Sequence, residues 1–74
     1  MKITYDPSAD AAYIYLTPAV DQGQVDRTYP CDPVEVGGQI NLDFDALGRL
    51  LGIEVLDASR KLPELLLKAA EIIT

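Results

Sequence analysis

Four residues of the segment NLDFDALGRLLGIE have the spacing of a calcium-binding loop. The first, third, sixth and twelfth positions of a twelve-residue window are Asp43, Asp45, Gly48 and Glu54, as in a helix–loop–helix calcium site. That site also needs an oxygen ligand at its fifth position, where this chain has Leu47. It needs a helix on each side, where this chain alternates between apolar and polar residues. We therefore expect no metal at this segment.

The same residues suit a β-hairpin. The run Asp45-Ala46-Leu47-Gly48 is typical of a type I turn, with Asp first and with Gly last, where it can adopt a positive φ and form a bulge. The Asp45 carboxylate can accept hydrogen bonds from N–H groups of the turn itself. Glu54 then lies in the middle of a strand, several residues from the tip, and is poorly placed to close a metal cage.

Acid–base catalysis by the carboxylates is not favoured by the size of the chain. A carboxylate that transfers protons lies in a water-poor cleft, and 74 residues leave little room for a pocket on the order of several hundred Å³. Cys31 has no histidine in the chain to act as its base. We expect no catalytic residue and no cofactor. The carboxylates that we instead assign to turns and solvent are Asp10, Asp43, Asp45 and Glu54.

Glu54 has a second interpretation. Its cross-strand neighbour in the predicted hairpin is Asn41 or Asp43, and Arg49 is within reach of the same acidic group. A structural Glu–Arg pair is one explanation of this arrangement. The other is a recognition patch formed by Asp43, Arg49 and Glu54.

Charge and composition limit the classes of molecule that the chain is expected to bind. The chain has twelve acidic and six basic residues, a net charge of −6. Residues 1–57 hold ten acids and three bases, net −7, and residues 58–74 hold two acids and three bases, net +1. This balance repels nucleic acid and suits either solubility or docking onto a basic protein. One cysteine and no histidine exclude an internal disulfide framework and a zinc site.

The start of the chain predicts a cytoplasmic protein without a membrane partner. In MKITYDPSAD, Asp6 and Asp10 stand where a secretory signal has its apolar stretch. No run approaches the roughly 20 apolar residues that span a bilayer.

Period-two alternation predicts a small antiparallel β-meander of four to five strands. A C-terminal amphipathic helix is expected over about residues 60–73, with Pro63, a residue favoured at the first helical position, near its start. Its apolar stripe of Leu65, Leu66, Ala69 and Ile72 should pack on the sheet face that carries Leu51, Ile53 and Val55. We expect one compact α+β domain, residues 1–74, with this one helix and with its strands within 2–56. The expected strands are residues 2–5, 11–16, 25–29, 34–44 (interrupted at Gly37-Gly38) and 50–56.

Several polar residues and one glycine lie where an element ends, and we expect them to be structural. Asp6 precedes Pro7 and favours a turn, and Asp10 can accept N–H bonds at the end of the same loop. Ser59 or Asp57 should cap the C-terminal helix. The complete set of expected turn and cap residues is Asp6, Asp10, Asp45, Gly48 and Ser59.

Three leucines point away from the expected core. Leu50 and Leu56 should lie on the sheet face opposite Leu51, and Leu67 falls outside the apolar stripe of the helix. A shared patch of this kind predicts a symmetric homodimer. The alternative is that Leu67 covers the sheet edge and that Leu50 and Leu56 pack beneath the loop of residues 17–33.

Two motifs resemble a known family. YDPSADAAYIYL and INLDFDALGRLLGIEVLDAS are similar to the YuzE-like small bacterial proteins, domain-of-unknown-function family 2283. The resemblance implies a compact β-meander with a C-terminal helix and no established activity. Because such relatives often stand beside toxin-like proteins, it suggests an acidic, antitoxin-like partner of a basic protein. The function class that remains open beside this one is a small ligand- or metal-binding domain or enzyme that uses Asp43, Asp45 and Glu54.

Overall fold

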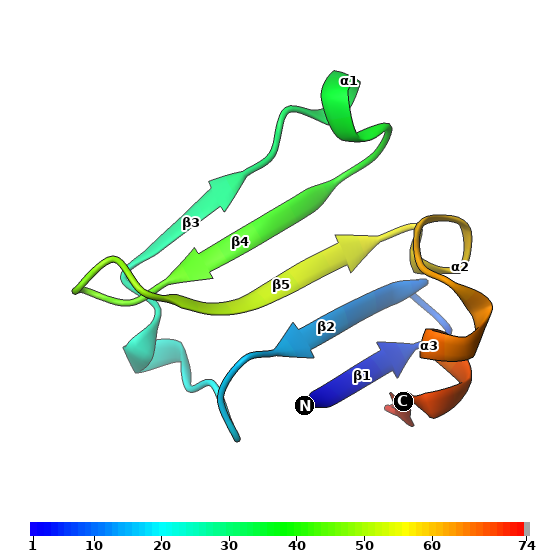
Figure 1. Cartoon of the computed structure of the whole chain (residues 1–74), viewed down its shortest axis with the longest axis horizontal. Coiled ribbons are helices and arrows are strands. Elements are labelled where there is room, and N and C mark those ends of the chain that lie inside the picture. The colour runs from blue at the N-terminus through cyan, green and yellow to red at the C-terminus, as the bar shows by residue number, and fades with distance from the viewer. Residues whose placement is uncertain (74) are drawn as a thin grey trace.

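The computed structural model describes residues 1–73 and shows one twisted sheet with its short α-helices at one end (Figure 1). None of the helices within this range is both long and apolar enough to cross a membrane. In chain order the elements are β1 (Lys2–Asp6), β2 (Ala11–Tyr15), the 3₁₀ turn η1 (Gln22–Gln24), β3 (Arg27–Pro30), α1 (Pro33–Val36), β4 (Ile40–Phe44), β5 (Leu50–Leu56), α2 (Ala58–Lys61), α3 (Glu64–Ala69) and β6 (Glu71–Ile72).

The sheet has six strands in the order β3-β4-β5-β2-β1-β6. All neighbours are antiparallel except β6, which runs parallel to β1. The α+β class is confirmed, but the prediction of a purely antiparallel meander of four to five strands is wrong. After α3 the chain turns back along the edge of β1, where Ile73 donates its N–H to the Tyr5 carbonyl at 2.9 Å. The last strand therefore lies outside residues 2–56.

The single C-terminal helix predicted over residues 60–73 is also wrong. Leu62 has extended backbone angles, φ −110° and ψ 148°, because the ring of Pro63 disfavours a helical conformation in the residue before it. The helix is thus divided into α2 and α3, and α3 ends at Ala69. Leu65, expected on the sheet, is 80% exposed. Leu67, expected to point away, packs against the core.

The segment before β4 differs from its predicted strand. Asp32 caps α1 by accepting the Val34 N–H at 2.9 Å, and Pro33 occupies the first turn. Val34 is 86% exposed, so its place in the alternating pattern was coincidental. Gly37 ends α1 with φ 66°, the left-handed conformation that glycine adopts readily. Two carbonyls at the C-terminal end of α1 accept hydrogen bonds from side chains of α2. The Arg60 guanidinium donates to the Gly37 carbonyl, and the Lys61 ammonium donates to the Val36 carbonyl.

Strand β3 forms one edge of the sheet and contains Pro30. Cys31 donates its N–H to the Ile40 carbonyl at 2.9 Å. Because N–H groups alternate in direction along a strand, an N–H at Pro30 would point away from β4. The proline therefore removes no ladder bond and leaves the free edge short of one donor, as edge strands require.

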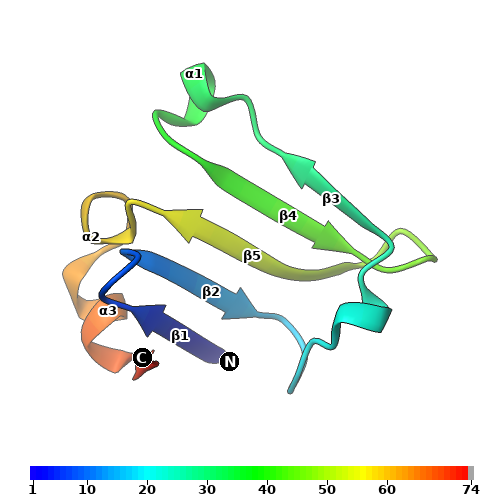
Figure 2. The same ribbon diagram turned by 180° about the vertical axis from the view of Figure 1, so that it is seen from behind.

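The core is small and lies under α2 and α3. Cross-strand pairing places Tyr5, Ala12, Val55 and Ile40 in one row across β1, β2, β5 and β4, and we call this side of the sheet the apolar face. Ala58, Leu62 and Leu67 pack over that row. Viewed from behind, the helices stay at this end of the sheet (Figure 2). Among the described residues the buried apolar side chains are Ala12, Leu51, Val55 and Ala58.

Candidate functional site

The β4–β5 hairpin uses Asp45 as its turn residue. One carboxylate oxygen accepts the N–H groups of Leu47 and Arg49, each at 2.9 Å, and the other accepts Arg49 Nε at 2.8 Å. Gly48 has φ 78° and donates its N–H to the Asp45 carbonyl at 3.0 Å. The Arg49 N–H, helped by its guanidinium and by the Leu47 N–H, lowers the pKa of Asp45. This carboxylate is fully used by its own turn.

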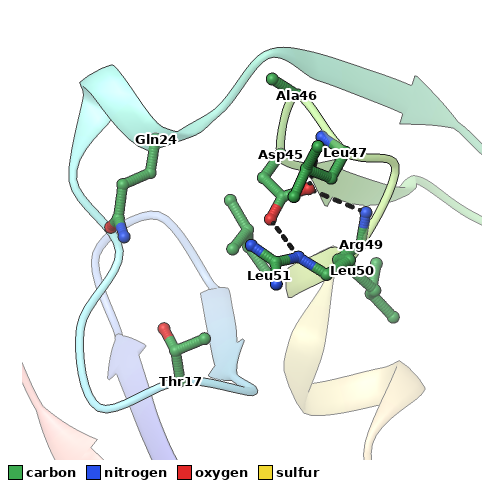
Figure 3. A pocket seen from close by; sticks show the side chains of 8 residues that line it. All are labelled: Thr17, Gln24, Asp45, Ala46, Leu47, Arg49, Leu50 and Leu51. Atoms are coloured by element: carbon green, nitrogen blue, oxygen red, sulfur yellow. Dashed lines mark hydrogen bonds and ion pairs between the residues drawn. The ribbon is translucent and has the colours of Figure 1, made fainter.

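Beside this hairpin lies an open recess of about 570 Å³. It separates the hairpin tip from Thr17 and Gln24 of the loop after β2 (Figure 3). Its two charged side chains, Asp45 and Arg49, are bonded to each other. The recess therefore offers a ligand no free charge.

Asp10 joins the β1–β2 loop to helix α2. One of its carboxylate oxygens accepts the Tyr5 hydroxyl at 2.7 Å and the Ser59 N–H at 2.9 Å, and the other accepts the Ser59 hydroxyl at 2.7 Å. The Ser59 hydroxyl, then the Tyr5 hydroxyl, lowers the pKa of Asp10, and the same contact raises the pKa of Tyr5. Asp57 makes no side-chain cap at this helix. Asp10, distant in sequence, takes that role, and Ser59 is its partner.

Asp6 holds the first half of the same loop. It accepts the N–H of Ser8 at 3.0 Å and the hydroxyl of Ser8 at 2.7 Å. The hydroxyl of Ser8 is the main cause of the lowered pKa of Asp6. Asp6 and Asp10 thus lie in a structural network that closes one end of the sheet.

The other side of the sheet, which we call the polar face, carries the remaining candidates. Its pairing places Asp43 beside Gly52 and Asn41 beside Glu54. The Asn41 amide donates to Glu54 at 2.9 Å. Two hydroxyls bond Asp43: Tyr13 at 2.7 Å and Thr28 at 2.6 Å.

Gly52 makes this arrangement possible. The Tyr13 ring crosses directly over Gly52 on its way to Asp43, and a Cβ at Gly52 would overlap the ring. Burial, followed by the hydrogen bond to Asp43, raises the pKa of Tyr13. The Tyr15 ring meets the Tyr13 ring edge-on, with 4.7 Å between their centroids. Tyr13, Tyr15 and Thr28 were absent from the predicted patch, although a mid-strand glycine signals close approach by another group.

A recess of about 340 Å³ opens on the polar face. The sheet contributes both tyrosines, Thr28 and two carboxylates to its wall, and the loop before β3 covers it from one side. The lining residues are Tyr13, Tyr15, Val20, Asp21, Val25, Thr28, Asp43 and Glu54.

The predicted recognition patch is therefore divided. Asp43 and Glu54 share the polar face, whereas Arg49 lies at the hairpin tip and pairs with Asp45 instead. Within residues 1–73, no three acidic or cysteine side chains are grouped as metal ligands.

The three predicted interface leucines also separate. The β4–β5 ladder shifts register next to Phe44, so Phe44 opposes Leu50, and the bulge brings Leu50 to the apolar face rather than the opposite one. Leu56 pairs with Ala11 and stays on the polar face. Leu67 belongs to the core. They form no common patch.

These features define a class of small α+β domain, in which one mixed sheet is closed at one end by a Tyr5–Asp10–Ser59 network. The chain belongs to the family described as "Protein of unknown function (DUF2283)", which matches residues 2–59. This confirms domain-of-unknown-function family 2283, which the two motifs indicated. No curated protein and no solved structure matches the chain.

The matched region ends at Ser59, the residue bonded to Asp10. Tyr5 and Asp10 from the first motif thus meet Ser59 from the second, and these three motif positions are explained by one network. Helix α3 and strand β6 lie outside the match.

Proposed function

We propose that the chain is a non-catalytic interaction module that binds a basic protein through its polar face. The observation that carries the proposal is a pair of oriented carboxylates without an ion partner. Asp43 and Glu54 are held by hydroxyl and amide donors, which fix their direction but leave their charge. The four ion pairs of the described residues involve neither of them.

The tyrosines beside these carboxylates suit an arginine. A guanidinium pairs with a carboxylate through parallel hydrogen bonds and stacks on an aromatic ring. Tyr15 already accepts a cation on its ring, since the Lys2 ammonium lies 5.0 Å from the centroid. The recess between Tyr13, Asp43 and Glu54 offers both kinds of contact to an incoming side chain.

The finer form of this proposal is an acidic, antitoxin-like protein that neutralises a small basic partner. A net charge of −6 supports fast association with a basic surface. The direct test is co-expression with the product of each adjacent gene, followed by purification of any complex that forms.

A short arginine-rich peptide is a probe that requires no knowledge of the partner. Titration into ¹⁵N-labelled protein should shift the amide signals of Tyr13, Tyr15 and Asp43. The double variant Asp43→Asn/Glu54→Gln should weaken binding about tenfold, a loss of the size expected for charge-assisted contacts. The control Glu64→Gln/Glu71→Gln removes the same charge from exposed residues and should keep most of the affinity.

Equal weakening by both double variants would show that only net charge matters and would overturn the proposal. Glu54→Gln alone serves as a second variant, because Gln keeps the acceptor for Asn41 and should leave the fold intact.

A further inference from the structure

A continuous row of large apolar side chains crosses the apolar face. The pairing registers join β1 to β2, β2 to β5, β5 to β4 and β4 to β3 at equivalent positions. Directly opposed residues share a face, so this row is one strip across five strands. The strip, here called the apolar row, consists of Ile3, Ile14, Ile53, Leu42 and Tyr29.

The helices cover this row only in part, since Ile3, Ile14, Leu42 and Ile53 are half-buried and Tyr29 is exposed. Leu62 and Leu67 pack over the neighbouring row that holds Ala12 and Val55, and Ile53 alone of the apolar row also contacts that cluster. Tyr29 is 51% exposed, and Leu16, the residue that follows β2, is 40% exposed. In the described part of the chain, no large side chain is completely buried.

The surface area and shape agree with a missing layer. The chain exposes 4910 Å², whereas a folded monomer of its mass exposes roughly 4500 Å². Its extents are 33 × 29 × 19 Å, those of a plate. A sheet with one apolar face is stable when a second layer covers that face, and here the helices cover one end only (Figure 1).

The distribution of charge indicates which kind of molecule forms the second layer. The apolar row contains no charged residue, and Arg27 in the next row is held over the Phe44 ring, 4.7 Å from its centroid. A basic protein would find no carboxylate in this row. Asp43 and Glu54 lie on the opposite face, so two sheets stacked about 10 Å apart keep these acids beyond a Debye length.

From this geometry we infer that a second copy of the chain covers the apolar row, and that the two sheets pack face to face about a two-fold axis. A self-complementary apolar strip is what an isologous contact requires. Pairing through the edge of β3 is disfavoured because Pro30 lacks the outward N–H. The contact uses the face opposite the proposed partner site and does not depend on that function.

The available area predicts a weak dimer. Five strands at about 4.8 Å spacing and four residues at about 3.4 Å, which leaves out the row under the helices, give roughly 330 Å² in projection for each copy. Two copies then bury roughly 650 Å² in projection, which is below the minimum of about 1000 Å² for a stable specific interface and is in the range of weak ones. We therefore expect a dissociation constant in the micromolar range.

Sedimentation equilibrium of the full chain tests the contact. Wild type should form a dimer at micromolar concentration, and Leu42→Glu should raise the dissociation constant about 100-fold or more, because a carboxylate would be buried in an apolar contact. Leu65→Glu makes the same change at an exposed leucine of α3 and should leave the dimer intact.

Methyl NMR of the wild type tests the same contact without a substitution, so the test stands even if Leu42→Glu fails to fold. On dilution, the methyl signals of Ile3, Ile14 and Leu42 should shift while those of Leu65 stay fixed. A wild type that is monomeric at hundreds of micromolar would overturn the inference. So would a dimer whose dilution shifts lie at Leu65 and not on the apolar row.

Discussion

At the scale of single residues, the absence of a side chain at Gly52 decides the chemistry of the polar face. The Tyr13 ring occupies the space of the missing Cβ and delivers its hydroxyl to Asp43. Thr28 bonds the same carboxylate from β3. Asp43 thus links strands β2, β3 and β4. The hydrogen bond from Tyr13 depends on Gly52, because a side chain there would occupy the space of the Tyr13 ring.

Replacement of Gly52 by Ala should therefore displace Tyr13 and break its bond to Asp43. We expect a loss of about 2 kcal/mol in the free energy of unfolding, from overpacking and from the lost hydrogen bond. Gly23→Ala is the matched control, since a Cβ there meets no atom within 4 Å, and it should change stability by less than about 0.5 kcal/mol. Urea unfolding measures both. Equal stability of the two variants would contradict this account.

At the scale of elements, contacts between residues close together in the sequence were predictable, and contacts between distant residues were not. The Asp45–Gly48 turn was identified because its determinants lie within four residues. The Asp10–Ser59 cap joins residues 49 positions apart, and nothing local marks such a pair. The effects of two prolines were predicted wrongly. Pro33 begins helix α1, where the alternating pattern predicted a strand. Pro63 separates α2 from α3, where the helical periodicity predicted one continuous helix.

The turn itself makes a sharp test of the hairpin. Gly48→Ala should reduce the free energy of unfolding by at least about 1 kcal/mol, because alanine is strained at the φ of 78° that this position adopts. Gly48→Asn should lose less, since asparagine tolerates the left-handed conformation. Thermal unfolding followed by circular dichroism distinguishes the two. An alanine variant as stable as the asparagine variant would rule out strain as the cause.

At the scale of the whole molecule, acid should weaken the fold. The pKa values of Asp6, Asp10 and Asp45 lie below the ordinary value of 3.8, so their ionised forms stabilise the folded state above that pH. This contribution is lost as the pH falls through 3.8 toward the lowered values.

The free energy of unfolding should thus stay level from neutral pH to about pH 5 and decline below about pH 4. Asp10→Asn should be less stable at neutral pH and show a shallower decline in acid, because one of the three titrating groups is gone. Urea unfolding across this pH range measures the slope. Parallel curves for the variant and wild type would remove Asp10 from the explanation.

The bond between Asp10 and Ser59 also bears on how the chain reaches its fold. The first hairpin, β1–β2, is local, but its inner neighbour β5 and its helix cap come from the far end of the matched region. Closing so long a loop costs chain entropy before the contacts that reward it are made. Strand β2 therefore stays unpaired on its inner edge until β5 forms a ladder with it. We expect this long-range pairing, rather than formation of the β1–β2 or β4–β5 hairpin, to limit the rate of folding.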